Sequence, residues 1–170
     1  VERGRLLMKL SAKVAEHANM LRSTGRQVVI NVDGGGVGGG VIDRLRSTGY
    51  DVNEVQFGAR ALDPRKWANR RAEIWGAMRE WLVGGAIPRD ELLATDLTSV
   101  EYWYNAADAV LLEKKESMKA RGLASPDSAD ALAITFAVPV PIGEFFASPH
   151  RITRPERLAQ QREYDPFAAL

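Results

Sequence analysis

A short apolar run that ends in an acidic residue and a glycine tract constrains the fold of this chain most strongly. The run extends from Val28 to Val32, is rich in β-branched residues and is followed by Asp33 and seven residues of which six are glycine. These properties predict a buried strand that places Asp33 at its C-terminal end. A short helical pattern and a second apolar run over Val52–Phe57 follow. This order predicts a parallel strand pair within an α/β layer.

Two further acidic residues, Asp127 and Asp130, lie near the C-terminal end of the patterned sequence. Ser125 and Pro126 predict the N-cap and the first residue of a helix that carries both acids on one face. Singly, Asp127 could complement the helix dipole and Asp33 could form a turn. Together, Asp33, Asp127 and Asp130 form the all-oxygen ligand set that Mg²⁺ or Mn²⁺ prefers. We take all three as candidate metal ligands and catalytic residues.

The remaining patterns predict helices over Glu2–Arg22 and from Asp63 to about Leu82, and a strand–turn–strand unit over Tyr102–Glu113. Arg71 falls within the apolar stripe of the second helix. The glycine tract after Asp33 lacks the Gly-Lys-Ser/Thr ending of a nucleotide-hydrolysing loop. We interpret it as a tight strand-to-helix turn that leaves space above Asp33 for a bulky substrate.

Composition excludes several classes of protein. With 45% hydrophobic and 26% charged residues, the 170-residue chain has the composition of a globular domain. The absence of cysteine excludes disulfides and thiolate metal sites, and no apolar run is long enough to cross a membrane. A net charge of +1 means that any nucleic-acid binding must depend on a local basic patch. The candidate DNA-binding residues are Arg70, Arg71, Lys114, Lys115, Lys119 and Arg121, although such charge runs are equally often a solvated face.

Read in order, these segments resemble the C-terminal nuclease domain of the large terminase subunit of tailed bacteriophages. The matching pieces are the strand and glycine tract over 32–41, the segments 69–75 and 112–119, Arg121-Gly122, the acidic helix block 125–132, and Thr135-Phe136. The resemblance extends from about Val28 to Ala137. The block around Asp127 and Asp130 is specific when it follows the basic stretch, whereas the glycine tract alone is a weak signal.

The resemblance implies an α/β, ribonuclease H-like mixed β-sheet flanked by helices, and a two-metal endonuclease that cuts concatemeric viral double-stranded DNA during genome packaging. Two Mg²⁺ or Mn²⁺ ions would activate water and stabilise the leaving oxygen. By the same resemblance, Asp33 is the strand acid and Asp130, with Asp127, the helix acid. A further acid of the family lies on its first strand, upstream of the segment that matches Glu2–Arg22. Implied partners are double-stranded DNA, the terminase small subunit and the portal protein, in the host cell cytoplasm and without a membrane.

For domain organisation we expect a nuclease domain over residues 1–149, incomplete at its N-terminus, and a flexible C-terminal tail over residues 150–170. Two other functions stay open. One is a ribonuclease H-like junction resolvase, which shares the acid pair on the last helix. The other is a non-catalytic DNA or portal docking module in which the acids are only structural.

Overall fold

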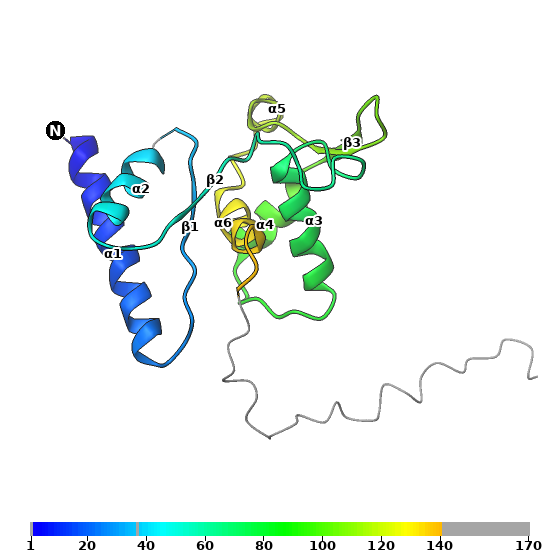
Figure 1. The fold of residues 1–170 in the computed structure, drawn as a ribbon. Helices are drawn as coiled ribbons and strands as arrows, with labels where there is room; N and C mark the ends of the chain where they lie inside the picture. Colours follow the sequence, from blue (N-terminus) through cyan, green and yellow to red (C-terminus); the bar gives the residue numbers. More distant parts are fainter. Residues whose placement is uncertain (1, 37, 141–170) are drawn as a thin grey trace, which may run out of the picture. The chain divides into compact units, whose positions relative to one another are not determined.

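The computed structural model describes residues 2–36 and 38–140, and Figure 1 shows their helices and strands. The described elements belong to one compact unit that ends at Val140, and none of their helices is long and apolar enough to span a membrane. The predicted tail over residues 150–170 lies outside the described residues. The elements are α1 (Glu2–Ser23), β1 (Asn31–Asp33), α2 (Gly38–Ser47), β2 (Asn53–Val55), α3 (Arg70–Leu82), α4 (Glu91–Ser99), β3 (Tyr102–Tyr104), β4 (Val110–Leu112), α5 (Lys115–Ala120), α6 (Asp127–Ala133) and the 3₁₀ turn η1 (Ile134–Phe136).

The described strands form two separate pairs. β1 pairs with β2 in parallel, with Val32 opposite Glu54, which confirms the predicted parallel pair although both strands are shorter than expected. β3 and β4 form the predicted antiparallel unit, with Trp103 opposite Leu111. The α/β class is therefore confirmed, with small two-stranded sheets in this part of the chain.

The first hydrophobic core lies between α1, α2 and β1. Its fully buried centre comes from α2, where Val41, Ile42 and Leu45 recur at helical spacing and are at most 3% exposed. A glycine is required at the start of α2, because a Cβ atom on Gly38 would lie 1.7 Å from the carbonyl oxygen of Asp33. The tract after β1 is thus the tight strand-to-helix turn that the sequence predicts.

The helix predicted from Asp63 begins seven residues later, so that part of the prediction is wrong. α3 starts at Arg70 after the N-cap residue Asn69, whose side chain accepts a hydrogen bond from the Ala72 N–H (2.9 Å). The preceding segment is instead drawn towards β4, since the Trp67 backbone forms a bridge with Val110. The Trp67 ring packs on the Cα of Gly76, where a Cβ atom would lie 2.1 Å from the ring.

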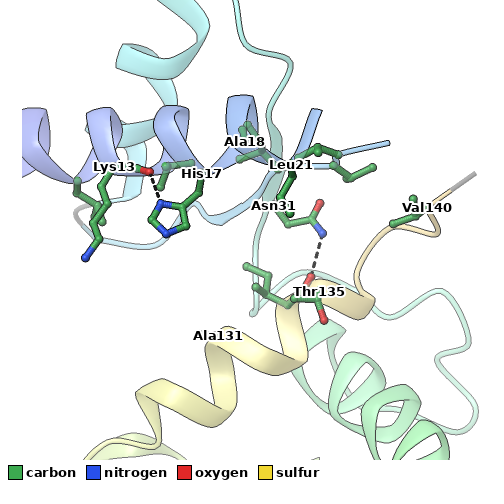
Figure 2. A pocket seen from close by; sticks show the side chains of 14 residues that line it. Lys13, His17, Ala18, Leu21, Asn31, Ala131, Thr135 and Val140 are labelled. Atoms are coloured by element: carbon green, nitrogen blue, oxygen red, sulfur yellow. Dashed lines mark hydrogen bonds between the residues drawn. The ribbon is translucent and has the colours of Figure 1, made fainter. Parts of the chain in front are cut away.

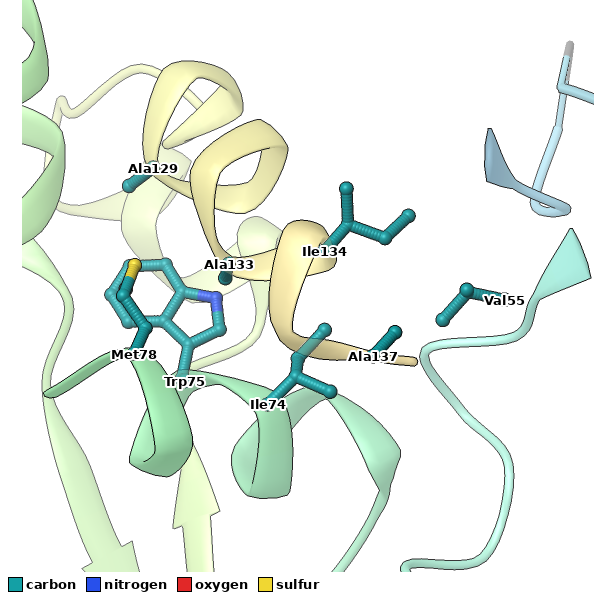
Figure 3. Packing of buried hydrophobic residues seen from close by; sticks show 8 residues of the cluster. All are labelled: Val55, Ile74, Trp75, Met78, Ala129, Ala133, Ile134 and Ala137. Carbon is teal, nitrogen blue, oxygen red and sulfur yellow. The ribbon is translucent and has the colours of Figure 1, made fainter. Parts of the chain in front are cut away.

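The second hydrophobic core joins α3 to α6 and η1 (Figure 3). Ile74, Trp75 and Met78 on α3 face the small residues Ala129 and Ala133 on α6. The two alanines are fully buried, which lets the helices approach closely. This close packing brings the polar side chains of α3 against the N-terminal half of α6, where the candidate acids lie.

Candidate functional site

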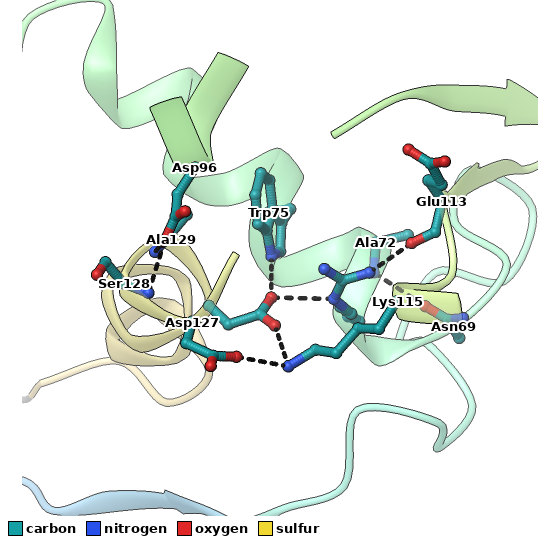
Figure 4. Close-up of polar contacts among 11 residues, drawn as sticks. Asn69, Ala72, Trp75, Asp96, Glu113, Lys115, Asp127, Ser128 and Ala129 are labelled. Carbon is teal, nitrogen blue, oxygen red and sulfur yellow. Dashed lines mark hydrogen bonds and ion pairs between the residues drawn. The ribbon is translucent and has the colours of Figure 1, made fainter. Parts of the chain in front are cut away.

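The two acids of α6 differ sharply in environment. Asp130 is 5% exposed, whereas the Asp127 side chain is 79% exposed. The helix N-terminus is also capped differently from the prediction: Pro126 is the N-cap residue, and neither it nor Ser125 provides a side-chain cap. The Asp96 carboxylate of α4 accepts instead from the backbone N–H groups of Ser128 (2.9 Å) and Ala129 (3.4 Å), as Figure 4 shows. A residue distant in sequence therefore supplies this cap.

One oxygen of the Asp130 carboxylate is held by two donors from α3. The Arg71 Nε–H and the Trp75 indole N–H each donate to Asp130 Oδ1 at 2.9 Å. All three side chains are buried, so these bonds are sheltered from water. Because the two donors come from adjacent turns of one helix, they fix both the position and the rotation of the carboxyl group.

The other oxygen of Asp130 faces Lys115 of α5. Lys115 Nζ lies 3.0 Å from Asp130 Oδ2 and 3.1 Å from Asp127 Oδ1, so that one ammonium joins both acids (Figure 4). The contact with Oδ2 is an ion pair without hydrogen-bond alignment, and Oδ2 is buried with no other donor among the described residues. Burial lowers the pKa of Lys115, but the contacts with Asp130 and Asp127 outweigh it and hold the pKa above its usual value.

A fourth acid, Glu113, lies at the junction of β4 and α5 and is 1% exposed. The Arg121 Nε–H (3.0 Å) and the Ser117 hydroxyl (2.7 Å) donate to its Oε1 atom, and Arg121 Nη2 donates to Oε2. These contacts, with that of Arg121 the strongest, lower the pKa of Glu113 to about 2. Arg71 Nη1 donates to the main-chain oxygen of the same residue (2.9 Å), so Glu113 is linked to Asp130 through one guanidinium.

Asp33 lies where the sequence placed it, at the C-terminal end of β1. Its Oδ1 atom accepts a hydrogen bond from the Gly35 N–H (2.9 Å), which is the turn-forming interaction considered as the simpler alternative. Among residues 2–36 and 38–140, no three His, Asp or Glu side chains are grouped so that they could hold a metal ion. The joint role of Asp33 with Asp127 and Asp130 therefore stays a prediction.

The six candidate DNA-binding residues fall into two groups. Arg71 is buried against Asp130, and Lys115 pairs with both acids of α6. Arg70 pairs with Glu73 and donates to the Ala137 carbonyl, while Arg121 pairs with Glu113 and Glu101. Lys114 and Lys119 are exposed and form no ion pair with the described residues. Four of the six cations thus have structural partners, and two remain available at the surface.

Comparisons of the sequence and of the structure with known proteins gave different results. No protein-family model matches the sequence, and no curated protein matches it. Solved structures do match: the nuclease domain of the large terminase subunit gp2 of bacterial virus Sf6 aligns with a TM-score of 0.55 and 21% identity, over 72% of this chain and 70% of that one. Point-mutant forms of the domain, solved with manganese and with calcium, align over the same shares at 20% identity and a TM-score of 0.55.

The chain has the fold of a terminase nuclease domain. This confirms the ribonuclease H-like α/β fold that the sequence resemblance implied. A sequence identity near 20% supports a shared fold and nothing more. The chemistry must therefore be argued from the residues of this chain.

Within the terminase nuclease fold, sequence reasoning missed two contributors to the candidate site. Glu113 was not singled out, because in the sequence it is one more charge at the start of a charged stretch. Trp75 was not singled out either, although its indole N–H needs a partner when buried. The position of Arg71 in an apolar stripe was the available signal, since a charge on a core-facing stripe requires a buried counter-charge.

Proposed function

We propose that this chain is a metal-dependent endonuclease domain that cuts concatemeric viral double-stranded DNA during genome packaging. The observation that carries the proposal is Asp130, a buried carboxylate with one oxygen held by two hydrogen bonds and the other held only by the Lys115 ion pair, in a fold shared with terminase nuclease domains. A carboxylate that served only the fold would be expected to have both buried oxygens hydrogen-bonded.

The residues around Asp130 suit a divalent cation of the Mg²⁺ or Mn²⁺ type. Asp130 Oδ2 and the exposed carboxylate of Asp127 are hard oxygen donors, and both already share one cation, the Lys115 ammonium. We assign Asp130 and Asp127 as ligands and Asp33 as the ligand from the strand side. When bound, such ions supply an activated water and neutralise charge on a scissile phosphate.

The protein side of this mechanism consists of orientation and charge control. Arg71 and Trp75 hold Asp130 Oδ1, which leaves Oδ2 as the reactive ligand atom. Lys115 lies against the same oxygens that would hold a divalent ion, so its ammonium offsets part of the charge of the two acids when the site is empty. Lys114 and Lys119 are the cations best able to contact DNA phosphates, in a manner independent of sequence. By resemblance, the small subunit and the portal protein are the further partners.

The test compares Asp130→Asn with Glu116→Gln, a change of an exposed acid on α5. Mn²⁺ binding is measured by electron paramagnetic resonance, and cleavage of supercoiled plasmid is measured with Mn²⁺ at a temperature where both variants are folded. We expect Asp130→Asn to weaken Mn²⁺ binding by at least about tenfold and to abolish cleavage, as loss of an essential ligand should. Glu116→Gln should change neither quantity.

Unchanged Mn²⁺ binding by Asp130→Asn would remove this residue from the metal site and favour a docking module. Preference for a four-way junction over linear duplex DNA would favour the resolvase alternative. Uniform cutting of duplex DNA would support the terminase assignment.

A further inference from the structure

The short helix α5 carries Lys115, the cation that joins the two acids of α6, yet it has little support of its own. α5 spans six residues, and a helix of this length is not stable in water without tertiary contacts. Its N-cap residue, Lys114, provides no side-chain cap, and the helix stops at Gly122, whose φ is +78°. The orientation of Lys115 therefore depends on contacts that α5 makes with its surroundings.

The neighbouring helix α6 is held at both ends without α5. At its N-terminal end, the Asp96 carboxylate accepts from the backbone N–H groups of Ser128 and Ala129. Beyond its C-terminal end, the Asn31 Nδ2–H of β1 donates to the Ile134 carbonyl oxygen (3.1 Å), as Figure 2 shows. The position of Lys115 relative to the acids is thus decided by whatever holds α5.

One ion pair connects the two ends of α5. Arg121 directly follows the helix, and its guanidinium reaches back to Glu113, which precedes the helix. The Arg121 Nε–H donates to Oε1 of Glu113 (3.0 Å) and Nη2 donates to Oε2, so the pair is bidentate. The Ser117 hydroxyl, from within the helix, donates to the same Oε1 atom (2.7 Å). We call the pair of Arg121 and Glu113 the α5 clamp.

The α5 clamp also reaches the elements around the candidate site. Arg121 Nη2 donates to the Ser99 carbonyl oxygen at the end of α4 (2.9 Å), and Nη1 lies 3.1 Å from the Glu101 carboxylate. The main-chain oxygen of Glu113 accepts from Arg71 Nη1 (2.9 Å), and Arg71 Nε donates to Asp130 (Figure 4). A displacement of Glu113 would therefore move a direct partner of Asp130.

An arginine with these partners is poorly suited to bind DNA. All three guanidinium nitrogens of Arg121 lie against protein oxygens. A phosphate could take the guanidinium only by leaving the carboxylate of Glu113, which is 1% exposed, as an unpaired buried charge. Lys119 belongs to the same basic stretch, but it is exposed and forms no ion pair with the described residues. The two cations should therefore have different roles.

We propose that Arg121 and Glu113 are positioning residues of the candidate nuclease site and that Arg121 does not contact DNA. The α5 clamp places the main-chain oxygen of Glu113 for Arg71 and the start of α5 for Lys115. Through these two cations it sets the position of the Asp130 carboxylate. The inference rests on the proposed function, but the environment of Asp130 can be measured without cleavage.

The first measurement needs neither metal nor DNA. The Trp75 indole N–H donates to Asp130, so its resonance in a ¹H–¹⁵N NMR spectrum reports the geometry of that hydrogen bond. We expect Arg121→Ala to shift this resonance at a temperature where the variant is folded. Glu113→Gln, which keeps the volume of the side chain but removes its charge, should shift it as well. Lys119→Ala and the control Arg89→Ala, both at exposed positions, should leave it in place.

The second measurement separates positioning from contact with DNA. With Mn²⁺ and plasmid DNA, Arg121→Ala should lower kcat and the affinity for Mn²⁺ by at least about tenfold and leave KM for DNA unchanged. Lys119→Ala should instead raise KM and reduce the salt dependence of DNA binding. The double variant Arg121→Ala/Glu113→Gln should lose no more activity than the more impaired single variant, because both changes break the same clamp. Arg89→Ala should change none of these quantities.

An unmoved Trp75 resonance in folded Arg121→Ala would overturn the proposal, whatever the variant does to stability. A raised KM with unchanged kcat in the same variant would also overturn it and would return Arg121 to the DNA-binding residues. If the resonance shifts while the unaltered protein neither binds Mn²⁺ nor cuts DNA, the connection from the α5 clamp to Asp130 is supported and the proposed function alone fails.

Discussion

The two hydrophobic cores of this domain differ in what they bury alongside apolar side chains. Around α2 the core is aliphatic, and the buried polar residue there is Ser11, which donates to the Leu7 carbonyl of its own helix. Around α3 and α6 the domain buries three charged side chains, those of Arg71, Glu113 and Asp130. Both cores lie in the same compact unit, so their difference cannot be attributed to size or exposure of the domain.

Buried charges are a costly way to stabilise a fold. Desolvation of an ion pair often exceeds its Coulombic attraction, and apolar residues of similar volume are commonly as stable or more stable. The aliphatic core shows that this chain can bury apolar side chains efficiently. We therefore interpret the charged core as retained for the candidate site, and the following predictions test that difference.

The largest effect on stability is expected when one member of the charged core is removed. Arg71→Leu leaves the Asp130 carboxylate without its guanidinium partner and should lower the free energy of unfolding by about 3–5 kcal/mol. Urea denaturation at neutral pH measures this change. The matched control is Arg79→Leu, an exposed arginine on the same helix, which should have little effect.

The double variant Arg71→Leu/Asp130→Leu sharpens the comparison. Removing both charges should recover much of the stability lost in the single variant, because no unpaired buried charge remains. If the double variant is as unstable as the sum of its two single changes, the Arg71 and Asp130 side chains are not energetically coupled and the contrast between the cores fails.

A smaller effect is expected for truncation in the aliphatic core. Leu45→Ala should cost about 3 kcal/mol, since Leu45 is fully buried and its neighbours can relax only partly. Thermal and urea denaturation measure the change, with Leu62→Ala as control because Leu62 is 80% exposed. No second substitution is expected to recover this loss, because the described aliphatic core buries no charged side chain whose partner could be removed. A cost equal to that of the Leu62→Ala control would show that the aliphatic core is not closely packed.

The smallest effect concerns acid sensitivity. The pKa of Glu113 is about 2 in the folded protein and near 4.5 when the side chain is free, so its stabilising contribution is complete above pH 4.5 and is lost as the pH falls towards 2. Glu113→Gln should therefore flatten the decline in unfolding free energy over this pH interval. Denaturation profiles of both proteins between pH 6 and pH 2 measure the slope, and identical slopes would contradict the assignment.

Local signals in the sequence predicted the local parts of this fold. The strand that ends at Asp33, the glycine turn and the parallel pair follow from short-range chemistry and are confirmed, although the strand is limited to Asn31–Asp33 and is half-buried where a buried strand was expected. The start of α3 was wrong because Asp63-Pro64 is a good local helix start, whereas the bridge between Trp67 and Val110 is a tertiary contact.

The environment of Asp130 could be predicted only in part for the same reason. The residue spacing predicted the helix that carries Asp130 and the position of Asp127 beside it. The partners of Asp130 could not be predicted, because Arg71 and Trp75 are more than 50 positions away, and only packing of α3 on α6 brings them together. The cap supplied by Asp96 across 32 positions is a similar case.

The hydrogen bond from Trp75 to Asp130 gives the domain an intrinsic optical reporter. Indole fluorescence responds to the electric field along its ring, and the Trp75 N–H points directly at the carboxylate whose charge balance Lys115 controls. Any event that changes that balance, whether protonation, loss of Lys115 or arrival of another cation, should shift the emission of a ring that is 8% exposed. With the three other tryptophans of the chain replaced, the occupancy of the carboxylate can thus be followed in real time without a label.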